Sequence, residues 1–98
     1  MAIEVRWLYS SKGSPIAFLY EGAVFSRSGK FLGFLEGNYV LYDEYVGELF
    51  EENRLVRQRL RPLMAKHEAG EDFALEMSPP KPIEAIVLPS ELQDLEPY

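Results

Sequence analysis

The sequence predicts a mainly β protein, built from three to four short β-hairpins and followed by an extended, Pro-rich C-terminal segment. Two observations carry this prediction. Eleven of the 13 aromatic residues and six of the 7 glycines precede residue 51, whereas six of the 7 prolines follow residue 60. In addition, one part of the sequence repeats another. We therefore expect a pseudo-symmetric hairpin-repeat domain over residues 1–77, then a linker and an acidic docking segment over residues 78–98.

The repeat has the form of a hairpin. Residues 8–19 (LYSSKGSPIAFL) align with residues 24–35 (VFSRSGKFLGFL) at an offset of sixteen, and each copy contains an aromatic strand, a Ser/Lys/Gly turn and an apolar strand. Residues 45–49 (YVGEL) form a third copy, and residues 54–60 are a candidate first strand of a fourth. Gly13 and Gly29 supply the positive φ that tight turns require. An isolated hairpin is marginally stable in water, so the units must share a core.

One position of the repeat is always small. Ala17, Gly33 and Gly47 occupy it, each in the middle of a predicted strand. A small residue in a strand interior indicates that another backbone or a ring approaches closely. Six aromatic residues are expected to fill the core, and any of them left exposed would mark an interface. They are Trp7, Tyr9, Phe18, Phe25, Phe34 and Tyr39.

Residues 43–61 also fit an amphipathic helix, with Asp43 as its N-cap, acids in the first turns and arginines in the last. Strands are favoured because Gly47 would destabilise a helix interior by about 1 kcal/mol. Further along, residues 73–77 are a candidate strand, and residues 83–88 are either a strand or a docking peptide. Ser90 and Gln93 have the spacing of a capping box for a short acidic turn.

The repeat resembles the small bacterial proteins called four-fold β-flower domains. The resemblance covers about residues 6–57 and rests on the motifs at residues 13–19, 29–35 and 45–49. It implies four hairpins arranged about a pseudo-fourfold axis. It implies no activity and supplies no catalytic residues.

Composition limits the function. The absence of cysteine excludes disulfides, thiol catalysis and Cys-type metal sites, and no stretch approaches the roughly 18 apolar residues of a membrane span. We expect a soluble, cytoplasmic protein. The net charge of −6 argues against a general nucleic-acid surface. However, positive charge is concentrated between residues 53 and 66, so nucleic-acid binding through the Arg54–Arg61 cluster remains an alternative.

Motifs for catalysis are weak. Six residues separate Gly22 from Gly29 where a phosphate-binding loop needs four, and Phe31 stands where that loop needs Ser or Thr. His67 with Glu68, Glu71 and Asp72 could bind a metal, which leaves a small metal-dependent hydrolase as a second alternative. A solvated polar loop explains these residues more simply. We expect no cofactor, no bound metal and no catalytic residue.

The leading hypothesis is a non-enzymatic binding or assembly module that contacts a protein partner or another copy of itself. The arginine cluster and the apolar positions of the C-terminal segment are the candidate contact residues: Arg54, Arg57, Arg59, Arg61, Ile86, Val87, Leu88 and Leu92.

Overall fold

A computed structural model describes residues 4–42, 44–59 and 78–95, and these residues form an all-β fold. Its eight strands are β1 (Arg6–Tyr9), β2 (Pro15–Tyr20), β3 (Ala23–Ser26), β4 (Phe31–Glu36), β5 (Tyr39–Tyr42), β6 (Glu44–Phe50), β7 (Arg54–Gln58) and β8 (Leu92–Asp94). Residues 73–77, a candidate strand in the sequence, lie outside the described residues.

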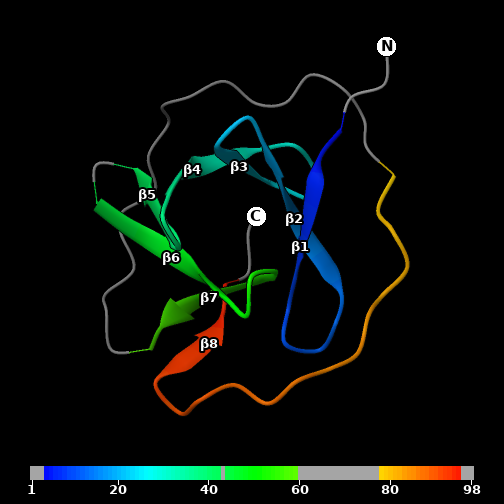
Figure 1. Cartoon of the computed structure of the whole chain (residues 1–98), viewed down its shortest axis with the longest axis vertical. Helices are drawn as coiled ribbons and strands as arrows, with labels where there is room; N and C mark the ends of the chain where they lie inside the picture. The colour runs from blue at the N-terminus through cyan, green and yellow to red at the C-terminus, as the bar shows by residue number, and fades with distance from the viewer. Residues whose placement is uncertain (1–3, 43, 60–77, 96–98) are drawn as a thin grey trace.

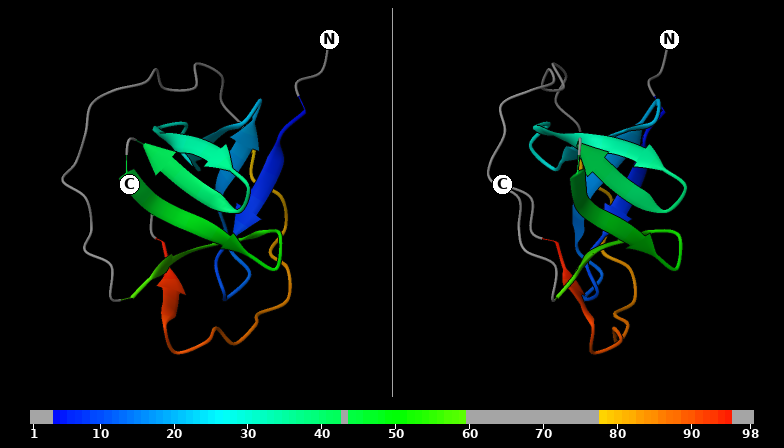
Figure 2. Two further views of the ribbon diagram at one scale, coloured as in Figure 1. Left: turned by 60° about the vertical axis from the view of Figure 1, so that its left-hand side comes forward. Right: turned by 90° about the vertical axis from the view of Figure 1, so that its left-hand side faces the viewer.

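The first seven strands form a closed ring. Each strand pairs antiparallel with the next, and a parallel pairing between Tyr9 and Arg54 joins β1 to β7. Strand β8 pairs antiparallel with the C-terminal part of β7, residues 56–58. Viewed as in Figure 1, the hairpins surround a common centre, and the turned views in Figure 2 show the same closed arrangement. Closure leaves few unpaired strand edges, which limits uncontrolled edge-to-edge association.

The fold consists of four petals, β1–β2, β3–β4, β5–β6 and β7–β8. Leu8, Val24, Val40 and Val56 occupy equivalent positions in the first strands of the four petals, at a constant offset of sixteen, and all are fully buried. The first three petals are local hairpins, as the repeat predicts. The fourth takes its second strand from the C-terminal segment, where Asp94 lies opposite Val56.

The small position of the repeat lies opposite these buried residues. Leu8 pairs with Ala17, Val24 with Gly33 and Val40 with Gly47, and a register shift follows each pair. A Cβ on Gly33 would lie 2.8 Å from the carbonyl oxygen of Leu41, and one on Gly47 would lie 2.7 Å from that of Val56. The predicted close approach of a neighbouring backbone is therefore present at both glycines.

Aliphatic and aromatic residues form two separate clusters. The aliphatic cluster contains Leu8, Ala17, Val24, Val40, Leu49, Leu55 and Leu95. The aromatic cluster, on the alternate residues of the same strands, contains Phe18, Phe25 and Phe31, with Trp7 packed against it. Rings on neighbouring strands contact one another in sequence: Trp7–Phe18 at 5.3 Å, Phe18–Phe25 at 5.4 Å and Phe25–Phe31 at 5.9 Å between centroids. These aromatic contacts link β1 to β4 across directly paired residues.

The helix alternative for residues 43–61 is wrong. Residues 44–50 and 54–58 are the antiparallel strands β6 and β7, in which Gly47 lies against the backbone of β7. Glu51 and Glu52 form the connecting turn, with φ of 51° and 71°. The capping-box reading is also wrong, because residues 92–94 are strand β8 and the Ser90 hydroxyl bonds to Glu91 rather than Gln93.

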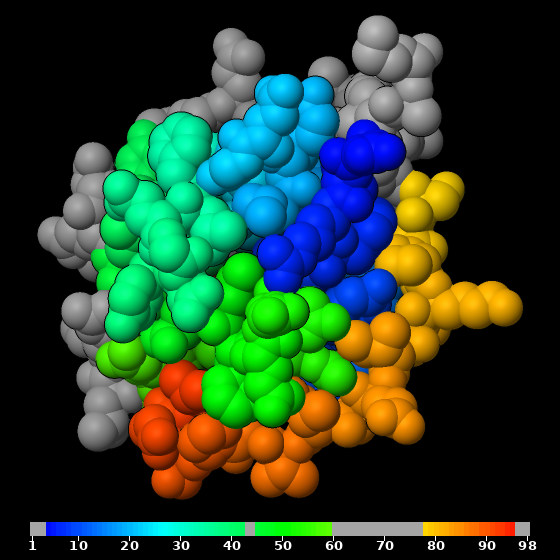
Figure 3. Space-filling view, viewed as in Figure 1, coloured from blue at the N-terminus to red at the C-terminus, as the bar shows by residue number. Residues whose placement is uncertain are grey.

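The C-terminal segment of the structure, residues 78–95, lies against the same domain. Figure 3 shows it in yellow to red along the β1–β2 turn and β7. The amides of Ile83 and Ile86 donate to the carbonyls of Gly13 and Ser11, at 2.9 and 2.7 Å. Beyond this, Leu92 and Leu95 are buried. Residues 83–88 thus dock on the β1–β2 turn without forming a strand.

Candidate functional site

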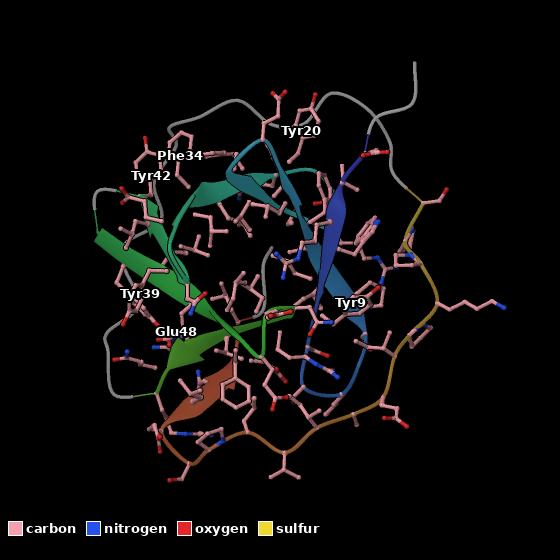
Figure 4. The ribbon with its side chains drawn as sticks, viewed as in Figure 1. Tyr9, Tyr20, Phe34, Tyr39, Tyr42 and Glu48 are labelled. Carbon is pink, nitrogen blue, oxygen red and sulfur yellow. The ribbon has the colours of Figure 1, made fainter. Side chains whose placement is uncertain are left out.

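A group of aromatic residues, two of them exposed and one half-buried, lies on the outer face of β4, β5 and β6. We call it the aromatic patch: Phe34 on β4, Tyr39 on β5 and Tyr45 on β6, flanked by Glu36 and Glu48. Phe34 is 55% exposed and Tyr39 47% exposed. In the described residues they stand out because large apolar side chains on the other strands are mostly covered. Figure 4 shows Phe34, Tyr39 and Glu48 projecting from one side of the molecule.

Strand register brings the patch together. Side chains alternate between the two faces of a strand, so residues that are paired across strands share a face. Tyr39 is paired with Glu36 on β4 and with Glu48 on β6. The rings of Tyr39 and Tyr45 meet edge to face at 6.2 Å. Both tyrosines thus lie beside a carboxylate.

The carboxylate of Glu48 is held in place by hydrogen bonds. The Tyr45 hydroxyl donates to Glu48 Oε1 at 2.8 Å, and Gln58 Nε2 donates to the same oxygen at 3.0 Å. The main-chain N–H of Gln58 in turn donates to the Tyr45 hydroxyl at 2.9 Å. Consequently a negative charge is fixed at one border of the patch, while the exposed Glu36 provides another at the opposite border. The patch can bind an apolar group that carries a positive charge.

A second candidate is a cavity of about 620 Å³ at the end of the ring where the petals are joined. Its lining comprises Arg6, Trp7, Leu35, Gly37, Asn38, Leu49, Glu51, Glu52 and Asn53. The Arg6 guanidinium donates to the main-chain carbonyl of Glu52, so this cation stabilises the turn that forms one wall. The lining mixes apolar side chains with one cation and two acids, and this mixture does not single out one ligand chemistry.

Two arginines of the predicted contact cluster hold the C-terminal segment. Arg54 is only 5% exposed and donates to the carbonyls of Ser10, at 2.9 Å, and Glu84, at 2.6 Å. Arg59 donates through its side chain to the carbonyls of Ser90 and Leu92, at 3.1 and 3.2 Å. Both guanidinium groups therefore bind main-chain oxygens within the chain, with acidic side chains playing no part in these bonds.

The remaining predicted contact residues lie in different environments. Arg57 is half-buried on β7, and Arg61 lies outside the described residues. Ile86 and Leu88 are half-buried, Leu92 is buried, and Val87 is 93% exposed. The described members of this predicted set differ in exposure and do not form one exposed surface.

The part of the chain that the structure describes shows no group of three or more His, Asp or Glu side chains that could hold a metal ion. His67 and its acidic neighbours lie outside that part. Within the same residues, no helix has the length and apolar character needed to cross a membrane.

The sequence did not predict the aromatic patch. Phe34 and Tyr39 were expected in the core together with Phe18 and Phe25, and for Phe34 and Tyr39 this expectation is wrong. Residues 32–35 and 39–42 are apolar on both faces, so alternation alone does not say which face is inside. The pairing of exposed aromatic residues with acids across β4, β5 and β6 becomes visible only once the register is known.

The closed ring of short hairpins defines a small hairpin-repeat β-domain. A family model described as "4-fold beta flower protein" matches residues 2–93, and the chain belongs to this family. The family resemblance drawn from the repeat is thereby confirmed. Neither the comparison with curated proteins nor the comparison with solved structures found a match.

Proposed function

We propose that this protein is a cytoplasmic, non-enzymatic assembly module that associates with further copies of itself through the aromatic patch. The observation that carries the proposal is the exposure of Phe34 and Tyr39 on adjacent strands. Single exposed apolar residues are ordinary on protein surfaces. Neighbouring exposed rings on one sheet face are characteristic of an interaction surface.

The size of the domain supports self-association. A chain of 98 residues buries only about 60 to 65% of the surface that it exposes when unfolded. Here the aliphatic cluster is small, and the aromatic side chains of Phe34 and Tyr39 remain exposed. Contact between copies would remove Phe34 and Tyr39 from water without changing the fold.

The fixed carboxylate supports a specific contact. Burying an ionised group is unfavourable unless it is paired and hydrogen-bonded. Glu48 already accepts two hydrogen bonds, so it needs only a cationic group from the partner. The patch therefore combines rings that supply contact area with a charge that orients the partner.

Sedimentation equilibrium of the full chain over a range of concentrations tests this proposal. We expect concentration-dependent association of the wild type, and we expect the double variant Phe34→Ser/Tyr39→Ser to remain monomeric. Val87→Ser is the matched control, because it removes an exposed apolar side chain outside the patch. A wild type that stays monomeric up to about 1 mM, where any contact would be weaker than about 4 kcal/mol, would refute the proposal.

A further inference from the structure

We propose that the group bound by the aromatic patch is the segment Pro79–Pro82 of a second copy of the chain. This inference rests on the proposed self-association and identifies its second surface. It makes the contact heterologous: the C-terminal segment of one molecule binds the patch of the next.

The segment has the chemistry that an acidic aromatic surface recognises. Its sequence, Pro79-Pro80-Lys81-Pro82, favours the polyproline II conformation, which is extended and already ordered before binding. Segments of this kind bind to aromatic surfaces because the proline rings pack on tyrosine and tryptophan side chains. Little conformational entropy is lost when they bind.

The segment is accessible in the folded chain. Pro79, Lys81 and Pro82 are exposed. Among the main-chain hydrogen bonds between described residues, those that fix the C-terminal segment to the β1–β2 turn begin at Ile83. Of the four residues before it, three are exposed and Pro80 is half-buried, and the segment that carries them is itself anchored.

Charge is complementary between the two surfaces. Lys81 is the only lysine or arginine in residues 78–98. The patch is bordered by Glu36 and by Glu48, whose carboxylate the Tyr45 hydroxyl holds at 2.8 Å. With proline rings packed against Tyr39, the Lys81 ammonium would lie within reach of these acids, and aromatic faces also attract cations.

The two surfaces lie on opposite sides of the molecule. The C-terminal segment is anchored on petal β1–β2, through Ser11 and Gly13, whereas Tyr39 belongs to petal β5–β6 across the ring. In Figure 4 the start of this ribbon, at residues 78–82, lies on the side opposite Phe34 and Tyr39, and the ribbon then runs along the bottom of the view. A molecule cannot satisfy its own patch in this arrangement. Heterologous contacts of this kind produce open chains, or rings if the rotation closes.

Complementation between two variants of the full chain tests the inference. The patch variant is Phe34→Ser/Tyr39→Ser, and the segment variant is Pro79→Ser/Lys81→Glu. All four side chains are exposed, so both variants should fold, which circular dichroism and thermal unfolding will verify. Sedimentation velocity reports the assembly state of each variant alone and of an equimolar mixture.

We expect the wild type to form species larger than dimers. Each variant alone should associate at least about thirtyfold more weakly, the effect of losing a principal contact residue. The mixture should form a 1:1 heterodimer and grow no further, because each partner retains one intact surface. Glu36→Lys should weaken association, and combining it with Lys81→Glu should restore part of it. Lys12→Glu, an equal charge change at an exposed turn, should leave association unchanged.

The outcomes separate the two proposals. A wild type that never associates refutes self-association itself. A segment variant that associates as well as the wild type, while the patch variant does not, shows that patches meet face to face; self-association then stands and the role of Pro79–Pro82 is refuted. A mixture without heterodimer also refutes that role.

Discussion

Replacing Gly33 by alanine tests whether β4 needs glycine because the neighbouring strand leaves no space. An added Cβ would lie 2.8 Å from the carbonyl oxygen of Leu41 and 3.1 Å from Val40 Cγ1. The first of these atoms is backbone, so strand β5 itself would have to move. Such overpacking costs about 1 to 3 kcal/mol. Because alanine in a strand recovers about 0.5 to 1 kcal/mol relative to glycine, we expect a net loss of about 0.5 to 2 kcal/mol.

Urea unfolding followed by tryptophan fluorescence measures this loss. With an m-value of about 1 to 2 kcal/mol per molar for a domain of this size, the midpoint should fall by about 1 M. Gly33→Leu adds a larger side chain at the same place, and we expect that variant to be unfolded. Gly22→Asn is the matched control: its φ is 80°, nothing lies within 4 Å of the added Cβ, and asparagine tolerates this conformation. We expect a change below about 0.5 kcal/mol there.

The result that refutes the reasoning is a Gly33→Ala variant as stable as the wild type. It would show that β5 yields without loss, and that the small position of the repeat does not reflect close packing. A destabilised Gly22→Asn with an unaffected Gly33→Ala would place the requirement for glycine in the turns instead.

Three further changes have definite expected results. Gly13→Ala would place a Cβ against the Ile83 carbonyl, so the C-terminal segment should detach and the Ile83 amide should lose protection in hydrogen exchange. Unchanged protection would contradict the docking of this segment on the β1–β2 turn. Arg54→Lys cannot reach both carbonyls that Arg54 binds, so thermal unfolding should show a loss of about 2 kcal/mol, and full stability would mean that one of these bonds is dispensable. Glu52→Gly should raise the free energy of unfolding, measured by urea denaturation, by about 1 kcal/mol, because Glu52 has a φ of 71° that glycine adopts without strain. A loss of stability would assign the glutamate side chain a structural role.

The hairpins of the first three petals could be predicted because their information is local. Turn residues such as Gly13 and Gly29 lie between consecutive strands, and the small position recurs where the next backbone comes close. The fourth petal could be predicted only in its first strand. Its second strand, Leu92–Asp94, is separated in sequence from β7, and three residues carry too little alternation to indicate a pairing partner.

The candidate site could not be predicted for a different reason. In β2, Ala17 and Phe18 are both apolar and both buried, although they belong to different clusters. Period-two alternation tells which residues share a face, and it leaves open which face is enclosed by the ring. The exposure of Phe34 and Tyr39 depends on ring closure and on what covers each sector of the outer face. Neither is encoded in any single stretch of the sequence.

The distant origin of β8 has a consequence for how the protein is made. The chain is synthesised from its N-terminus, so the strands of the first three petals and β7 are made before residues 92–95. Until then the edge of β7 that receives β8 is unpaired, and the inner cluster lacks Leu95. The fourth petal is therefore completed after the other three, and a chain cut short before Leu92 has an open strand edge that can pair with other chains.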